Sequence, residues 1–346
     1  MNCIRNMLLS LFFPVIILVF AGAEPVKAQF NGKIMTVKGP VEPAEMGLTL
    51  PHEHVLVDFI GADQVSRERY DRDSVAALVV PYLRDLKQAG GETLIECTPS
   101  YLGRDPVLLR RLSDQSGIKM LTNTGYYGNE KGNFLPSHVY EETARQLADR
   151  WTDEWKNGID GTGIRPGFIK LRVDKSPISE TGQKLLEAAA ETHKKSGLTI
   201  GVHTPDGATA LEQLEILSES GIDPAAFIWI HAQNESDSEI HQQVARMGAW
   251  VEFDGIGPSS ADYHFQLINS MKEADLLHRV LISHDAGWYR VGEPGGDPNS
   301  FDPYTYIINH FIPRLKREGF TPREIDMLTR ENPQQAFTIS VRTSDS

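Results

Sequence analysis

Residues 167–203 read GFIKLRVDKSPISETGQKLLEAAAETHKKSGLTIGVH and contain a complete strand–helix–strand unit. The segments 167–173 and 198–203 are apolar on both faces, as parallel strands covered by other elements must be. Between them, apolar residues recur at three- and four-residue steps over 180–196, which predicts an amphipathic helix. Ser179 is placed to cap the start of this helix, and a glycine follows its end.

The same alternation repeats along the chain from about residue 48. Strands are expected at 48–50, 93–98, 118–124, 167–173, 198–203, 227–231, 249–253 and 280–283. Helices are expected between them, among others at 73–89, 138–156, 180–196, 208–220 and 237–247. Eight strand–helix units predict an α/β protein with a (β/α)8 TIM barrel in a single domain. An open doubly wound sheet is the alternative, but no glycine-rich phosphate loop follows an early strand.

The composition is that of a folded, acidic protein. The 346 residues are 40% hydrophobic and 23% charged, and 34 Lys and Arg against 47 Asp and Glu give a net charge of −13. Such a surface repels phosphate backbones, so no nucleic-acid partner is expected. The barrel is expected to occupy 33–340, with a short extension at 31–47 and a closing helical segment at 321–338.

The first 28 residues predict a signal peptide. Only Arg5 is charged before an apolar run from Met7 to Ala23, and small residues precede cleavage sites after Ala23 or Ala28. The protein is therefore expected to be exported, to the periplasm or outside the cell. An uncleaved membrane anchor is the alternative, since the run barely reaches spanning length. Cleavage would leave Cys97 alone, without an internal disulfide.

Residue types that bind metals fall where the expected strands end. They are His52 and His54 after the first strand, Lys170 within the fourth, His203 after the fifth, His231 after the sixth and Asp285 after the eighth. Each alone has a structural explanation, such as a core histidine, a snorkelling lysine or an aspartate that caps a helix. Together, at the mouth of one barrel, they form an N/O ligand set suited to Zn²⁺ or another divalent transition metal.

At these residues the sequence resembles the phosphotriesterase family of the amidohydrolase superfamily, and the resemblance covers nearly all of 33–338. The matching stretches are GLTLPHEHVLVD, Gly103-Arg104-Asp105, Asn123-Thr124-Gly125-Tyr126-Tyr127, GFIKLRVD, GVHTPDG, IHAQNESD, ISHDAGW and Asn332-Pro333-Gln334-Gln335-Ala336-Phe337. The order of the ligand types along the chain is specific for this family, whereas the final stretch at 332–337 is a weak signal by itself.

The resemblance implies a metal centre with two divalent ions, expected to be Zn²⁺. His52, His54 and Asp285 would bind the buried ion, and His203 with His231 the more exposed one. Lys170 would be carboxylated on its amine, and the carbamate would bridge both ions together with a hydroxide. A carbamate fits this position because an ammonium would be repelled by two cations. Asp285 would accept the proton of the attacking hydroxide, so that Lys170 and Asp285 are the expected catalytic residues.

Three aromatic residues are candidates for substrate contact: Tyr127, Trp288 and Tyr289. Residues 291–303, rich in Gly and Pro, are expected to form a long loop that shapes substrate choice. Related lactonases carry an arginine where this chain has Gly255, and its absence argues against a homoserine lactone as substrate.

The function expected from these residues is metal-dependent hydrolysis of a small lactone, carboxylic ester or phosphotriester. An amidase or deacetylase with the same metal centre is one alternative, because the same centre attacks amides. A periplasmic barrel that binds a ligand without catalysis is the other. The oligomeric state stays open, with a homodimer among the arrangements.

Overall fold

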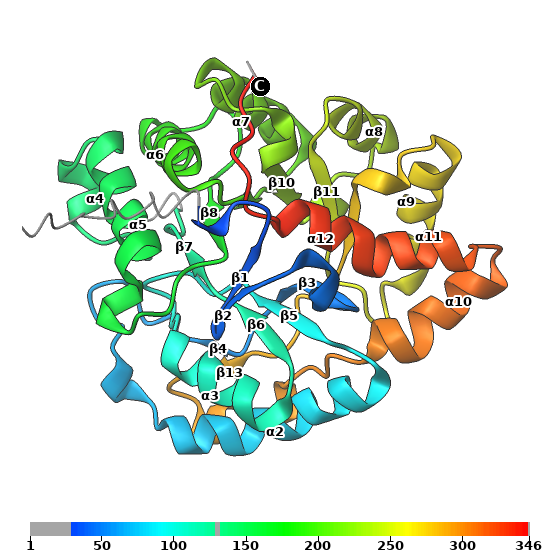
Figure 1. Ribbon diagram of the computed structural model, residues 1–346, viewed down its shortest axis with the longest axis horizontal. Coiled ribbons are helices and arrows are strands. Elements are labelled where there is room, and N and C mark those ends of the chain that lie inside the picture. The colour runs from blue at the N-terminus through cyan, green and yellow to red at the C-terminus, as the bar shows by residue number, and fades with distance from the viewer. Residues whose placement is uncertain (1–28, 129–131, 345–346) are drawn as a thin grey trace, which may run out of the picture.

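The computed structural model describes residues 29–128 and 132–344. Within these residues, the eight expected strands form one barrel, and the helices surround it as a ring (Figure 1). The predicted signal peptide and both of its cleavage sites lie outside the described residues. The predicted fold class, a single-domain TIM barrel, is confirmed.

All eight predicted strands are present at the expected places. They are β3 (Thr49–Glu53), β5 (Thr93–Glu96), β6 (Lys119–Leu121) continued by β7 (Asn123–Thr124), β8 (Phe168–Arg172), β9 (Ile200–His203), β10 (Phe227–Ile230), β11 (Trp250–Phe253) and β12 (Val280–Ile282). Neighbouring strands pair in parallel in this order. The third barrel strand is interrupted at Thr122, so β6 pairs with β5 while β7 pairs with β8.

The helices of the outer ring follow the strands. They are α2 (Arg72–Ala89), α3 (Pro106–Ser116), α4 (His138–Glu141), α5 (Ala144–Asn157), α6 (Glu180–Ser196), α7 (Gly207–Glu219), α8 (Ser238–Arg246), α9 (Ala261–Glu273) and α10 (Ile312–Arg317). The single helix predicted over 138–156 was wrong, because the chain is extended at Glu142 and Thr143. Thr143 and Gln146 form a capping box there, which starts α5 as a separate helix.

The barrel closes where β3 meets the end of β12. The His52 amide donates to Ser283 Oγ (3.0 Å), and the Asp285 amide donates to the His52 carbonyl (3.1 Å). Glu53 and Ala286 then form a parallel bridge. This seam therefore holds the first and last strand ends, and with them the predicted ligands, side by side.

Apolar side chains fill the barrel and close the end at which its strands begin. One buried cluster joins residues of the barrel strands to residues near both ends of the described chain; its strand members are Ile95, Leu121, Phe168, Ile228, Trp250 and Leu281. The hairpin of β1 (Ile34–Thr36) and β2 (Gly39–Val41) contributes Ile34, and α12 (Asn332–Phe337) contributes Phe337. In Figure 1, the hairpin and α12 lie across the middle of the ring. The expected extension and closing helical segment thus seal the amino ends of the strands, which leaves the carboxyl ends for the site.

Short elements complete the chain. A two-stranded sheet joins β4 (Leu56–Val57) to β13 (Tyr289–Arg290), and α11 (Pro322–Asp326) leads into a π-helical turn at Met327–Glu331. Cys97 is a buried free thiol. Over the described ranges, no helix combines the length and the apolar character needed to cross a membrane.

Candidate metal centre

A cavity of about 60 Å³ lies at the carboxyl ends of the barrel strands. All of the residues predicted as metal ligands line it: His52, His54, Lys170, His203, His231 and Asp285. They come from β3, β8, β9 and the ends of β10 and β12, which are far apart in sequence. The structure thus brings the predicted set together in one place.

The His54 ring is fixed by a hydroxyl behind it. Thr98 Oγ1 donates to the Leu56 carbonyl (3.0 Å), so it accepts from His54 Nδ1 at 2.7 Å. In the neutral ring, the proton therefore sits on Nδ1 and Nε2 carries a lone pair. That Nε2 faces Asp285 Oδ1 at 3.1 Å.

The His52 ring is fixed in the same way by carboxyl groups. Its Nδ1 lies 2.9 Å from Glu252 Oε1 and 3.1 Å from Asp254 Oδ2, which leaves Nε2 facing Asp285 Oδ1 at 3.6 Å. Burial lowers the pKa of His52 to about 4, so this ring is neutral at physiological pH. Neutral imidazole is the form that binds a metal ion.

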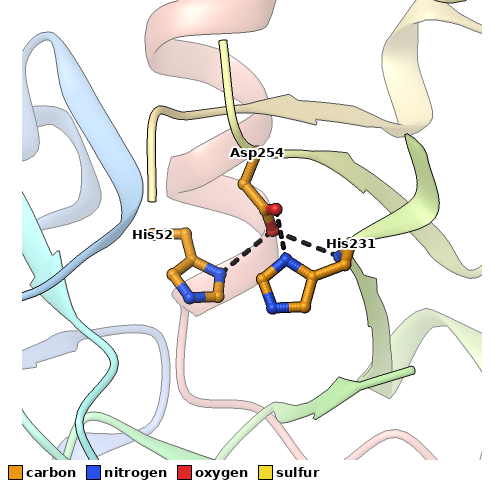
Figure 2. A group of neighbouring side chains, drawn as sticks. All are labelled: His52, His231 and Asp254. Atoms are coloured by element: carbon orange, nitrogen blue, oxygen red, sulfur yellow. Dashed lines mark hydrogen bonds and ion pairs between the residues drawn. The ribbon is translucent and has the colours of Figure 1, made fainter. Parts of the chain in front are cut away.

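Asp254 supports two of the predicted ligands at once. Figure 2 shows its carboxylate facing both the His52 and the His231 rings. It also accepts from the His231 amide (3.2 Å) and from Gln233 Nε2 (2.7 Å). Burial opposes ionisation, but the two histidine rings outweigh it and hold the pKa of Asp254 well below its usual range.

Asp254 could itself complete a metal site with His52 and His231, because the ligand atoms of the three lie within 4.8 Å of one another. However, both of its oxygens already face donors, and Asp254 does not line the cavity. Carboxylates that hold the far nitrogen of a metal-binding histidine are usual partners of such sites. We therefore assign Asp254 to orienting the two rings.

Asp285 supplies the observation that decides whether a metal fits. Its Oδ1 is buried and makes no hydrogen bond within the described part of the chain. The atoms that face it are the Nε2 atoms of His52 and His54, the ring nitrogens that carry lone pairs when both rings are neutral. Together with the carboxylate oxygen they form a set of three N/O ligand atoms of the kind that binds a divalent cation. The site residues thus fit a divalent metal ion.

Lys170 and His203 form the other wall of the cavity. Lys170 is 2% exposed, so it does not snorkel to solvent, and no carboxylate of the described residues lies within ion-pair distance of it. Burial lowers the pKa of His203 well below its usual value, and the neighbouring His231 lowers it further. A buried lysine without an anionic partner beside neutral histidines fits the expected anionic carbamate better than an ammonium.

The strand ends that carry the site are strained. His231 and Asp285 have φ angles of 64° and 57°, and Trp288 follows at 78°. Residues other than glycine avoid this left-handed region, which costs of order 1–3 kcal/mol each. Such strain is retained where the surrounding contacts impose it, and it is common at functional sites.

Of the three aromatic residues predicted to contact substrate, two line the cavity and one does not. Tyr127 lines the cavity with its hydroxyl 3.3 Å from His203 Nδ1, and Trp288 lines it with its ring centroid 4.0 Å from that of His54. Tyr289 does not line the cavity. The left-handed turn at Trp288 sends the chain into β13, where Tyr289 pairs with Leu56 and is buried against Gly296.

Several supporting residues were not predicted. Glu252 and Asp254 are two residues apart at the carboxyl end of a strand, as His52 and His54 are, and this spacing was a usable signal. Thr98 and Glu53 carry no such signal in the sequence, because hydroxyl and carboxyl side chains are common at the ends of strands. His284 points away from the cavity as strand alternation requires, and it contacts Glu53.

Comparison with known proteins agrees with this geometry. The family model described as "Phosphotriesterase family" matches residues 32–337. The chain belongs to the phosphotriesterase family. The predicted resemblance is thereby confirmed for the whole barrel.

Individual members of the family are similar over nearly their full length. The "Phosphotriesterase homology protein" of Escherichia coli K12 is 30% identical over 295 residues, which cover 84% of this chain and 98% of that protein. The "N-acetyltaurine hydrolase" of Danio rerio is 26% identical, covering 90% of this chain and 99% of its own. The solved organophosphorus hydrolase from Deinococcus radiodurans superposes with a TM-score of 0.79 at 28% identity, covering 89% and 97% of the two chains.

The geometry predicts the metal content of the protein. A preparation supplemented with zinc should hold about two divalent ions per chain, because the cavity is lined by two groups of candidate ligands, His52 with His54 and Asp285, and His203 with His231. Elemental analysis of the folded protein measures this number. One ion or none in a well-folded, zinc-supplemented sample would contradict a centre with two metals.

Proposed function

We propose that this chain hydrolyses uncharged ester-like substrates, namely lactones, carboxylic esters or phosphotriesters, with two divalent metal ions. The observation that carries the proposal is the buried Asp285 oxygen that makes no hydrogen bond among the described residues and faces the Nε2 atoms of His52 and His54. Membership of the phosphotriesterase family supports it.

In this proposal the ligands divide between two ions. His52, His54 and Asp285 would hold the buried ion, His203 and His231 would hold the outer ion, and a carbamate on Lys170 would be a ligand to both. Zn²⁺ is the metal expected for neutral imidazole and carboxylate ligands. When bound, two such ions supply an activated water and polarise the C=O or P=O bond of the substrate.

The side chains around the cavity do the remaining work. Asp285 can accept a proton from the attacking water because its Oδ1 has no other donor. Tyr127 stays protonated, since burial raises its pKa to about 12, and its hydroxyl faces the cavity beside His203. It can therefore donate a hydrogen bond to a substrate oxygen.

The walls of the cavity favour an uncharged substrate. Val57, Phe59, Leu102 and Trp288 line it, and no arginine does so within the described residues. Phe59 is 51% exposed at the mouth, with its ring centroid 6.1 Å from that of Trp288 and 5.9 Å from that of Phe134. An apolar or aromatic substituent can stack on these rings, whereas a bare anionic group would lose its hydration there.

Amide hydrolysis is the second candidate. The similar N-acetyltaurine hydrolases act, by their name, on an amide that carries a sulfonate. In this chain a cation does lie near the cavity: the Arg172 guanidinium is 5.1 Å from the Tyr127 ring centre, and its buried Nε has no hydrogen-bond partner among the described residues. Its Nη2 lies 3.3 Å from Asp174 Oδ1, so this arginine could pair with such an anion if Tyr127 moved and the contact with Asp174 were shared or replaced.

A substrate panel separates the candidates. We expect the metal-loaded protein to turn over neutral aryl esters, lactones or phosphotriesters faster than N-acetylated amino sulfonates. Preference for the amides would favour the second candidate. Binding across the panel without turnover would contradict hydrolysis and favour a binding barrel.

We further propose that residues 1–28 are an export signal and that 33–340 form the mature hydrolase barrel. The apolar run from Met7 to Ala23 supports export. The mature protein should begin at Glu24 or Gln29 and be found in the periplasm or the medium. An intact amino terminus in the cytoplasmic fraction would contradict this.

Replacement of Asp285 by Asn tests its role as ligand and proton acceptor. Asn keeps the shape but removes the charge and the basic oxygen, and loss of a general base typically costs about 10²–10⁴-fold in rate. We expect Asp285→Asn to lose at least about 10²-fold in turnover at saturating zinc, with nearly unchanged thermal stability.

The matched control is Asp206→Asn. Asp206 also follows a barrel strand and its side chain is also 27% exposed, but it caps α7 by accepting from the Thr209 amide at 3.0 Å. Asn caps a helix about as well as Asp, so this variant should keep its turnover. Equal turnover in both variants, on a substrate whose chemical step limits the rate, would remove Asp285 from the reaction.

Replacement of Lys170 by Ala tests the bridge. The variant should lose the second metal ion, and short carboxylic acids should partly restore activity by taking the place of the carbamate. A crystal structure of the wild type should show the adduct, whereas mass spectrometry in acid should show an unmodified lysine. Full metal content and full rate in Lys170→Ala would show that this lysine only fills space.

A further inference from the structure

We propose that Glu53 is a positioning residue for Asp285: it binds the peptide groups on both sides of Asp285 and so turns that carboxylate toward His52 and His54. This inference rests on the proposed function, in which Asp285 is a metal ligand and proton acceptor. Glu53 does not line the cavity and contacts no predicted ligand side chain.

Glu53 lies on β3 between two ligands. Because side chains alternate along a strand, its side chain points to the opposite side from His52 and His54. It is completely buried there, at 0% exposure. A buried carboxyl group needs strong hydrogen bonds to remain, and it finds all of them at the end of β12.

The two carboxyl oxygens of Glu53 are fully used. Oε1 accepts from Ser283 Oγ (2.7 Å), from the His284 amide (3.1 Å) and from His284 Nδ1 (2.7 Å). Oε2 accepts from the Ala286 amide (2.8 Å). Glu53 thus holds the residue before Asp285 by two groups and the residue after it by one.

His284 Nδ1 also donates a hydrogen bond to Glu53. His284 Nε2 accepts from the Ile307 amide at 2.9 Å, so the proton of the neutral ring sits on Nδ1 and points to Glu53. Glu53 is therefore the acceptor in all four of its hydrogen bonds. In Glu53→Gln, an NH₂ group replaces one of the accepting oxygens and would face an N–H or O–H donor.

Asp285 needs this support because of its backbone. Its φ of 57° lies in the left-handed region that residues other than glycine avoid. Most of the hydrogen bonds that hold the conformation come from β3 and the residue after it: the Asp285 amide donates to the His52 carbonyl (3.1 Å), the His54 amide donates to the Ala286 carbonyl (2.8 Å), and Glu53 binds both neighbours. Trp288 Nε1 adds a hydrogen bond to the Asp285 carbonyl (2.6 Å). Without Glu53, the turn can relax and carry the Asp285 oxygen away from the two nitrogens.

The test is Glu53→Gln in the full-length, zinc-loaded protein. Loss of a supporting group behind a metal ligand typically costs about 10–100-fold in metal affinity or activity. We expect Glu53→Gln to release zinc to a competing chelator with about 10–100-fold lower affinity and to lose turnover to a similar extent. KM should change much less than kcat, because the substrate walls are untouched.

Asn332→Ala is the matched control for stability. Asn332 Nδ2 donates to the Leu277 and Val280 carbonyls, both at 2.7 Å, and so supports β12 at the end opposite to Asp285. This variant should unfold at a lower temperature but keep the wild-type zinc affinity. If both variants lose zinc equally at equal loss of stability, or if Glu53→Gln keeps zinc and turnover, Glu53 is not a positioning residue.

Two further variants keep the result interpretable. Should Glu53→Gln fail to fold, Glu53→Asp keeps the charge, but its side chain is one methylene shorter and cannot reach both the His284 and the Ala286 amide. It should weaken zinc binding in the same direction by a smaller factor; wild-type affinity in Glu53→Asp would then overturn the inference. Asp285→Asn separates the two proposals. If it keeps zinc and turnover, the proposed function fails, whereas loss in Asp285→Asn with none in Glu53→Gln overturns the role of Glu53 alone.

Discussion

A barrel of parallel strands closes only when its last strand pairs with its first, and in this chain that pairing also sets the positions of the candidate ligands. β3 contributes His52 and His54 at the seam, and the chain after β12 contributes Asp285. Backbone hydrogen bonds across the seam run between the ligand residues themselves, from the Asp285 amide to the His52 carbonyl. Fold and site therefore depend on the same few contacts, and a change at the seam should affect both.

The second constraint is electrostatic. Burial keeps His52 and His203 neutral, so these rings offer lone pairs and no positive charge to the carboxylate of Asp285. Asp254 lies behind the His52 and His231 rings and accepts from their Nδ1 atoms. The cavity is left with acceptors that face inward, and a divalent cation is the simplest partner for them. Protein groups thus prepare the site for metal before any metal binds.

The sequence predicted the barrel because its main signals are local. Strand and helix periods, and glycines after helices, do not depend on distant contacts. The ligand set was also predictable, because the carboxyl ends of all barrel strands meet at one mouth, so residue types at strand ends could be assigned to one site. The convergence of residues from His52 to Asp285 follows from that rule alone.

What the sequence did not predict depends on turns and on contacts between distant elements. Tyr289 was placed with Trp288 because the two are adjacent, but the left-handed turn at Trp288 sends Tyr289 into β13. The break between α4 and α5 depends on the capping box at Thr143, which competes with a continuous helical pattern. Glu53 is the clearest case: its four hydrogen bonds come from three residues some 230 positions away, and no periodicity marks them.

The central claim is that these side chains enclose two metal ions at the mouth of the barrel. Anomalous diffraction at the zinc edge from crystals of the zinc-loaded protein tests it most directly, because it locates the ions. The account predicts two peaks about 3.5–4 Å apart, one beside His52, His54 and Asp285 and one beside His203 and His231, with extra density on Lys170 Nζ. A single peak beside Asp254, or no peak within the cavity, would contradict it.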